Sequence, residues 1–188
     1  MECLPGTVFP IDERALARTL RSLNLSLDPE YQEMLPRIHG GVPTHAYFDV
    51  AGDVRRVGWF TNFLNSESPV PAGRTETETI DRSLAEIVTD LNPFFDCEVT
   101  WPFCVLYDAN GVLRDTARFE THITYPADAL CFDNRTTPHS VVLSPASDSV
   151  SEMLDIENSS EWREPGYSFL IPVASSFREF VDSLRKLP

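Results

Sequence analysis

The sequence predicts an α+β fold: a mostly antiparallel sheet flanked by N-terminal helices, one inserted helix and a C-terminal helix. One observation behind this is the apolar periodicity, which is helical near both ends and in the middle of the chain and strand-like between them. Another is the length of 188 residues, which suits one domain, with no internal repeat or Gly-Ser linker to divide it. We therefore expect residues 1–188 to form a single domain.

Two helices are expected before the sheet. The first begins near Asp12, a side chain that can cap a helix, and the second begins at Pro29, after the capping residue Asp28. The second helix ends at Gly40-Gly41, and we expect Gly41 to take the positive φ of a helix C-terminus.

The β pattern starts after these glycines. Residues 45–50 and 54–60 predict a hairpin, and a helical pattern follows over 80–91, within a long insertion of about 66–125. A strand is expected over 99–107, where Pro102 favours a sheet edge or a bulge.

The rest of the chain predicts a second hairpin arm that reaches Tyr125, short strands at 129–132, 140–143 and 167–171, and a helix from about Ser175. Seven apolar side chains from the predicted helices and strands should share one core: Leu35, Ile38, Phe48, Ile87, Phe169, Phe177 and Phe180.

The composition is strongly acidic. Fifteen basic residues against twenty-nine acidic ones give a formal charge of -14. Nucleic acid and anionic membrane surfaces are therefore unsuitable partners, whereas a basic protein would be attracted. No apolar stretch is long enough to cross a bilayer, and no secretory signal is visible, so we expect a soluble, cytoplasmic protein without membrane insertion, as a monomer or weak dimer.

The residues that most often carry chemistry are scattered. Cys3, Cys97, Cys104 and Cys131 form no C-x2-C pair, which argues against a zinc site and favours free, structural thiols. His39, His45, His122 and His139 have no metal-ligand spacing, and we expect them to be exposed or hydrogen-bonded strand residues. Trp59 and Phe60 should lie in the core. The sequence predicts no metal, no cofactor and no enzymatic activity.

An acid-rich segment near residues 144–160 and beyond is the candidate protein-binding surface. It surrounds one tryptophan with charges, and that indole is either a lid over the core or an interface anchor. The segment is either an ordinary solvated loop or a recognition strip for a cationic protein surface. The candidate interface residues are Asp148, Glu152, Asp155, Glu157, Glu161, Trp162 and Glu164.

Three stretches of sequence also carry a family resemblance. They are LDPEYQEML with HGGVP (27–35 and 39–43), YPADALCFD (125–133) and IPVASSFREFVDSL (171–184). In this order they resemble the SUKH superfamily, which contains the Smi/Knr fungal cell-wall-synthesis regulators, the Syd proteins and many bacterial immunity proteins. His39 stands where the family usually has Asn, and residues 66–125 are longer than the simplest members need.

The resemblance implies a SUKH-like domain that binds another protein without chemistry of its own. Many members protect cells by binding toxins, often nucleases, so a cationic toxin domain is the expected partner. The alternative is a regulatory or scaffolding protein of the cell-wall-regulator type. A third hypothesis is an enzyme whose site assembles from residues distant in sequence.

Overall fold

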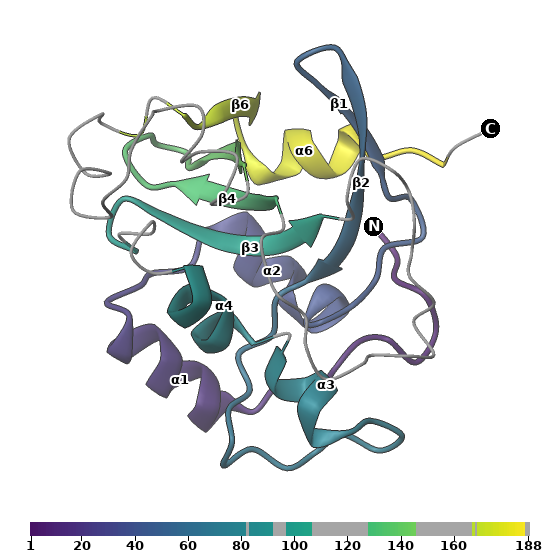
Figure 1. The fold of residues 1–188 in the computed structure, drawn as a ribbon, viewed down its shortest axis with the longest axis vertical. Coiled ribbons are helices and arrows are strands. Elements are labelled where there is room, and N and C mark those ends of the chain that lie inside the picture. Colours follow the sequence, from purple (N-terminus) through teal and green to yellow (C-terminus); the bar gives the residue numbers. More distant parts are fainter. Residues whose placement is uncertain (82, 92–96, 107–127, 146–166, 168, 187–188) are drawn as a thin grey trace.

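A computed structural model describes residues 1–81, 83–91, 97–106, 128–145, 167 and 169–186 (Figure 1). Its centre is a six-stranded sheet in the order β1-β2-β3-β4-β5-β6, in which every neighbouring pair is antiparallel. Helices precede the sheet, interrupt it after β2 and follow it, so the predicted α+β class is confirmed. The strands are β1 (Tyr47–Val50), β2 (Asp53–Phe60), β3 (Thr100–Leu106), β4 (Ala129–Asp133), β5 (Ser140–Ser144) and β6 (Ile171–Ala174).

Both N-terminal helices begin at the predicted caps. In front of α1 (Glu13–Ser22), one carboxylate oxygen of Asp12 accepts hydrogen bonds from the backbone N–H groups of Arg14 (2.9 Å) and Ala15 (3.1 Å). Asp28 does the same for α2 (Pro29–Ile38), with the N–H groups of Glu30 and Tyr31 as donors. Each cap satisfies two of the donors that a helix leaves unpaired in its first turn.

The turn after α2 corrects one prediction. Gly40, not Gly41, has the positive φ, +68°. Gly41 is required for space instead, since a Cβ atom there would lie 2.8 Å from the Sγ atom of Cys3. Gly41 also joins the turn to β2, because its carbonyl accepts a hydrogen bond from the N–H of Phe60 (2.9 Å).

The inserted helix is two helices, which corrects the single helix expected over 80–91. α3 (Glu76–Asp81) is followed by α4 (Leu84–Leu91). The N–H of Leu84 donates to the carbonyl of Asn62 (2.7 Å), and the N–H of Glu86 donates to the Ser83 hydroxyl (3.2 Å), so Ser83 caps a new helix. A contact with the chain after β2 therefore interrupts a continuous helical pattern.

Pro102 lies at a bulge inside the sheet. The register between β3 and β4 shifts between Pro102 and Cys104, and β3 has a neighbour on each side. Of the two possibilities for this proline, the bulge is confirmed and the edge is wrong. The second hairpin arm expected up to Tyr125 lies outside the described residues.

The last strand starts later than expected. The prediction placed it at 167–171, but β6 is Ile171–Ala174. Tyr167 has a φ of +61°, and its carbonyl accepts from the N–H of Leu170 (3.1 Å), which makes a turn where the sequence suggested a strand. The final helix, α6 (Phe177–Ser183), follows as expected.

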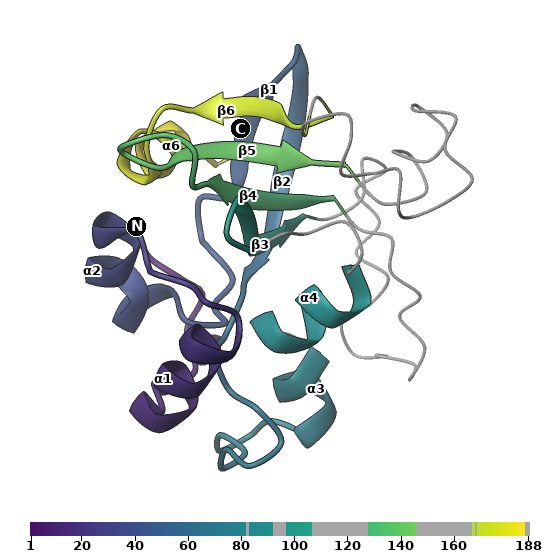
Figure 2. The same ribbon diagram turned by 90° about the vertical axis from the view of Figure 1, so that its left-hand side faces the viewer.

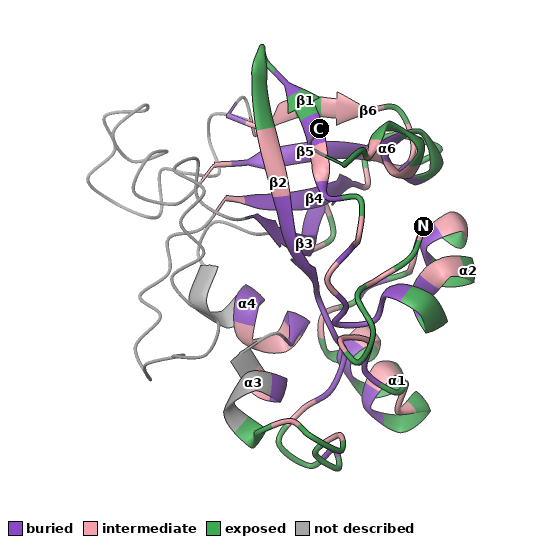
Figure 3. Cartoon of the chain, turned by 90° about the vertical axis from the view of Figure 1, so that its right-hand side faces the viewer, coloured by how far each residue is buried: buried purple, intermediate pink, exposed green. Residues whose placement is uncertain are grey.

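The core divides between the two faces of the sheet. Alternate strand residues point to opposite sides, so in β4 Leu130 and Phe132 join a large cluster with α2 and α6, whereas Ala129 and Cys131 join a smaller one. Figure 3 shows that burial concentrates in β3, β4 and β5, while the tip of the β1–β2 hairpin is exposed.

The predicted core residues are all buried, but they do not all share one cluster. Ile87 belongs to the smaller cluster with Trp59, and Phe169 lies against Tyr167, with ring centroids 6.0 Å apart. Five of the seven lie in the large cluster: Leu35, Ile38, Phe48, Phe177 and Phe180.

The segment after α6 closes the outer side of the β1–β2 hairpin. The backbone N–H and carbonyl groups of Arg185 and Tyr47 bond reciprocally, at 2.9 and 3.0 Å. The Arg185 guanidinium also pairs with the Asp49 carboxylate. These bonds cover part of a strand edge that would otherwise present unpaired backbone groups.

Candidate functional site

The seven candidate interface residues lie outside the described part of the chain, which stops at Pro145 and resumes at Tyr167. The structure does describe the two places where this acid-rich segment joins the fold. They are the C-terminal end of β5 and the turn before β6. The candidate site is therefore built from the end of the sheet that holds both attachments.

Four strand ends meet there. The N–H of Leu106, at the end of β3, donates to the carbonyl of Asp128 (2.9 Å), immediately before β4. At the same end, Ala129 is paired with Ser144 and Leu143 with Ile171. The β3–β4 and β5–β6 connections therefore leave the sheet from one end, which Figure 2 shows opposite the turn between β4 and β5.

An ion pair fixes this end of the sheet. Arg55 of β2 reaches past the last residue of β3 and pairs with the carboxylate of Asp128. The two side chains are only 15% and 22% exposed, so water screens the pair less than it screens a surface ion pair. The pair carries no net charge, whereas residues 146–166 contain six acidic residues and a single arginine. The ion pair itself therefore adds no net charge where the acid-rich segment joins the fold.

A polar cluster that the sequence did not reveal lies at the opposite end of β4 and β5. His139 Nδ1 is 3.9 Å from Asp28 Oδ2, and the two side chains are 21% and 3% exposed. Asp133 also lies near this histidine. The Arg135 guanidinium donates hydrogen bonds to both carboxylate oxygens of Asp133, each at 2.8 Å, and these bonds lower the pKa of the Asp133 carboxyl. The Asp28 oxygen nearest His139 is not the one that caps α2, so one carboxylate serves two purposes.

His39 is a buried structural histidine at the end of α2. Its Nδ1 donates to the carbonyl of Phe9 (3.2 Å), and its Nε2 accepts from the N–H of Phe63 (2.8 Å). Burial lowers the pKa of the imidazole to about 4, because the charged form loses its hydration. The neutral ring therefore joins three segments of the chain and is unsuited to proton transfer at neutral pH.

The other histidines have different surroundings. His45 is exposed, with Nδ1 3.4 Å from the Thr44 hydroxyl, and His122 lies outside the described residues. None of the three described histidines lies within a strand, contrary to the expectation: His39 follows α2, His45 precedes β1 and His139 precedes β5.

The cysteines are free thiols in apolar surroundings. Cys104 and Cys131 are buried, and desolvation raises the pKa of both well above the ordinary value. Burial also raises the pKa of Cys3 to about 11. Within the described residues, no three His, Cys, Asp or Glu side chains gather in positions that could hold a metal ion.

Trp59 and Phe60 are buried, as predicted, in the smaller and the larger cluster respectively. Trp162 lies outside the described residues. Across the described ranges, no helix has both the length and the apolar character needed to cross a membrane.

Comparison with known proteins identified no relative of this chain. A scan against protein-family models, a search of curated proteins and a search of solved structures each found no match to this chain.

Proposed function

We propose that this chain is a SUKH-like immunity protein, a non-enzymatic domain that binds a cationic, nuclease-type toxin and blocks it. The block would be steric and electrostatic, with the acid-rich segment 146–166 covering a basic cleft on the toxin. No cofactor or metal takes part in this proposal.

The observation that carries it is the meeting of the three family-like stretches around one ring. Tyr31 comes from the first stretch, Phe132 from the second and Phe177 from the third. The ring centroid of Tyr31 lies 5.4 Å from that of Phe132 and 5.2 Å from that of Phe177, and the two phenylalanines are 5.7 Å apart. The three stretches contact one another in a single aromatic cluster. This supports the interpretation that they form one family signature and are not three chance matches.

Charge gives independent support for a basic partner. The chain carries a formal charge of -14, and 146–166 supplies six of its acids against one arginine. A nuclease presents cationic side chains to phosphate, so an anionic protein can approach such a cleft quickly and occupy it. The attachment of the segment at one end of the sheet would let a rigid scaffold present it.

The direct experiment begins with the genes that adjoin the gene for this chain, where an immunity protein should have its toxin, and uses the toxin domain encoded there. Its nuclease activity is titrated with the purified protein, and we expect inhibition that is complete at one equivalent. Binding without inhibition would favour the regulatory or scaffolding alternative. Absence of binding would refute the proposal.

Two variants of the segment test the mechanism on the immobilised toxin domain. Reversing Asp155 and Glu157 to Lys should slow association and flatten its salt dependence, as expected for charges at an interface rim. Trp162→Ala should act differently and speed dissociation if the indole is a buried anchor.

A charge-matched control distinguishes the segment from the overall charge. Asp53 and Asp182 are exposed acids in β2 and α6, and reversing both to Lys changes the net charge equally. An equal loss of association rate in this control would show that the total charge acts and that the segment is not the binding site.

A further inference from the structure

The outer face of α1 carries a stripe of arginines. Arg14, Arg18 and Arg21 are separated by four and then three residues, so they lie within about 60° of one another around the helix axis. All three are exposed, whereas Ala15 and Thr19, farther round the helix, are buried. The stripe spans about 10 Å along the helix.

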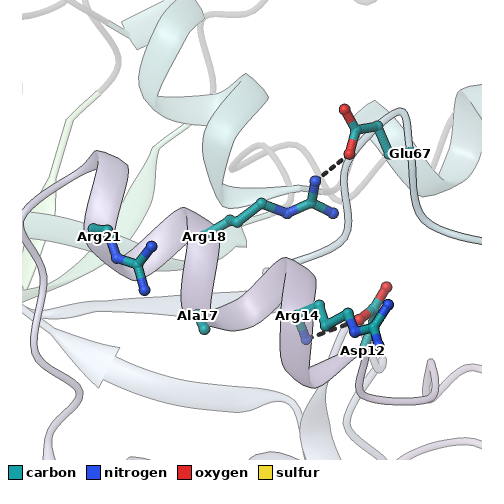
Figure 4. A pocket seen from close by; sticks show the side chains of 6 residues that line it. All are labelled: Asp12, Arg14, Ala17, Arg18, Arg21 and Glu67. Carbon is teal, nitrogen blue, oxygen red and sulfur yellow. Dashed lines mark hydrogen bonds and ion pairs between the residues drawn. The ribbon is translucent and has the colours of Figure 1, made fainter.

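These arginines line a surface hollow of about 590 Å³, together with Asp12, Ala17 and Glu67 (Figure 4). Ala17 contributes only a methyl group, which leaves space beside the longer side chains. Arg18 extends across the hollow to the loop after β2, where its guanidinium pairs with the Glu67 carboxylate. The hollow therefore has a basic helix on one side and a loop on the other.

The charge of this hollow is opposite to that of the protein. Three arginines against two carboxylates leave it positive, in a chain whose formal charge is -14. Neither Arg14 nor Arg21 forms an ion pair with any side chain that the structure describes. Arg21, in the last turn of α1, is favoured by the helix dipole, but like charges four residues apart destabilise a helix slightly, so folding does not account for the whole stripe.

Asp12 is held mainly by the helix that it caps, although the charge of Arg18 also acts on its carboxylate. One of its oxygens accepts the backbone N–H groups of Ala15 and Arg14, and these bonds hold the pKa of its carboxyl below the ordinary range. It acts as the helix cap, and Glu67 engages Arg18 alone among the three arginines. Arg14 and Arg21 remain available to an incoming anion.

We propose that this hollow, the α1 arginine site, binds an acidic segment of a partner protein. Guanidinium groups bind carboxylates through paired hydrogen bonds, and a helix with glutamates at i, i+4 and i+7 presents them over the same length as the arginine stripe. A nucleic acid carries charge along its whole length and would be repelled by the rest of the chain, whereas a short acidic segment need meet only the arginine stripe. The site is open and built from exposed side chains, so each ion pair contributes little by itself. This suits an acidic segment that belongs to a partner protein with further contacts elsewhere.

This site is independent of the toxin proposal, since it lies on α1 and attracts a partner of the opposite charge. The probe is a fluorescein-labelled helical peptide with glutamates at i, i+4 and i+7, and its control carries glutamine at those positions. Fluorescence anisotropy should show that the protein binds the glutamate peptide and that affinity falls as salt rises.

Variants locate the binding on α1. Replacing Arg14, Arg18 and Arg21 together by Gln should weaken binding about tenfold, as expected from the loss of several exposed ion pairs. Arg37→Gln is the matched control for the single variant Arg14→Gln, which should weaken binding less than the triple variant, because Arg37 is an exposed arginine in the last turn of α2. Glu67→Gln should strengthen binding, since it removes a competing carboxylate from the hollow.

Several results would overturn the proposal. They are no binding of the glutamate peptide, equal binding of the glutamine peptide, or equal binding by the triple variant with an unchanged thermal midpoint. Tighter binding of pyrophosphate or of a single-stranded oligonucleotide than of the peptide would also overturn it, by assigning the arginines to phosphate.

Discussion

The two ends of α2 are held to the rest of the molecule in different ways. Near its beginning, the Tyr31 ring packs edge-on against three phenylalanines, with centroids 5.2–5.8 Å apart. At its end, the single imidazole of His39 hydrogen-bonds two distant backbone groups. Packed rings stabilise the fold at any pH, whereas a buried imidazole stabilises it only while neutral. One helix therefore combines a pH-independent attachment with a pH-dependent one.

The largest effect is expected from the aromatic attachment. Phe177→Ala removes a fully buried ring that contacts Tyr31, Phe103 and Phe132, and it should lower the free energy of unfolding by about 3–5 kcal/mol. Urea unfolding at neutral pH measures this. Val54→Ala is the control, because Val54 is 52% exposed and its truncation should change stability by about 0.5 kcal/mol or less. A loss below about 1 kcal/mol for Phe177→Ala would show that the cluster is not a main source of stability.

The polar attachment should make stability depend on pH. His39 has a pKa of about 4 in the folded protein against 6.5 for an ordinary histidine, so between these values the unfolded chain binds more protons. This contribution is fully present above pH 6.5 and is lost as the pH falls towards 4, about 3 kcal/mol in all.

Urea unfolding at several pH values tests this against a non-titrating variant. His39→Gln should be less stable than the wild type at pH 7, and the difference should shrink as the pH falls. His45→Gln, at an exposed histidine, should leave the wild-type pH dependence unchanged. Parallel curves for the wild type and His39→Gln would contradict the prediction.

Local signals in the sequence predicted the beginnings of the first two helices correctly. Asp12 and Asp28 cap their helices through bonds to backbone groups two and three residues away, so a short window contains the whole interaction. The division of the inserted helix into α3 and α4 could not be predicted in this way. The interruption at Ser83 depends on the carbonyl of Asn62, which only the folded chain brings near.

The candidate sites show the same limit. Asp28 and His139 lie close together because the start of α2 lies against the turn before β5. No spacing in the sequence indicates this contact. The arginine stripe on α1 has a regular spacing that a helical projection reveals. The total charge, which is dominated by acidic residues, does not indicate it. The acid-rich segment was found from composition, and its role stays a prediction.

Substituting the two glycines that follow α2 should lower the free energy of unfolding by less than the His39 contribution. The cause differs between the two positions. Gly40→Ala should cost about 2 kcal/mol, because φ is +68° and the new Cβ atom would lie 2.8 Å from the Phe9 ring. Gly41→Ala should cost about 1 kcal/mol, since its φ is not positive and the crowding atom is the end of the Cys3 side chain.

Two further variants separate strain from crowding. Cys3→Ala should restore part of the stability lost in Gly41→Ala, and it should not rescue Gly40→Ala. Gly73 has a φ of +78° with open space around it, so Gly73→Ala measures backbone strain alone, about 1 kcal/mol. Equal losses at Gly40 and Gly73 would mean that the contact with Phe9 contributes nothing.

The smallest effect concerns the other end of α2, where Asp28 both caps the helix and faces His139. Asp28→Ala leaves the N–H groups of Glu30 and Tyr31 without their acceptor, and it should cost about 1 kcal/mol in urea unfolding. Asp28→Asn keeps a capping oxygen and removes the charge, so it should cost less. If Asn costs as much as Ala, the attraction to His139 matters more than the cap. Combining each substitution with His139→Gln separates the two, because the cap does not depend on the imidazole whereas the contact between Asp28 and His139 does.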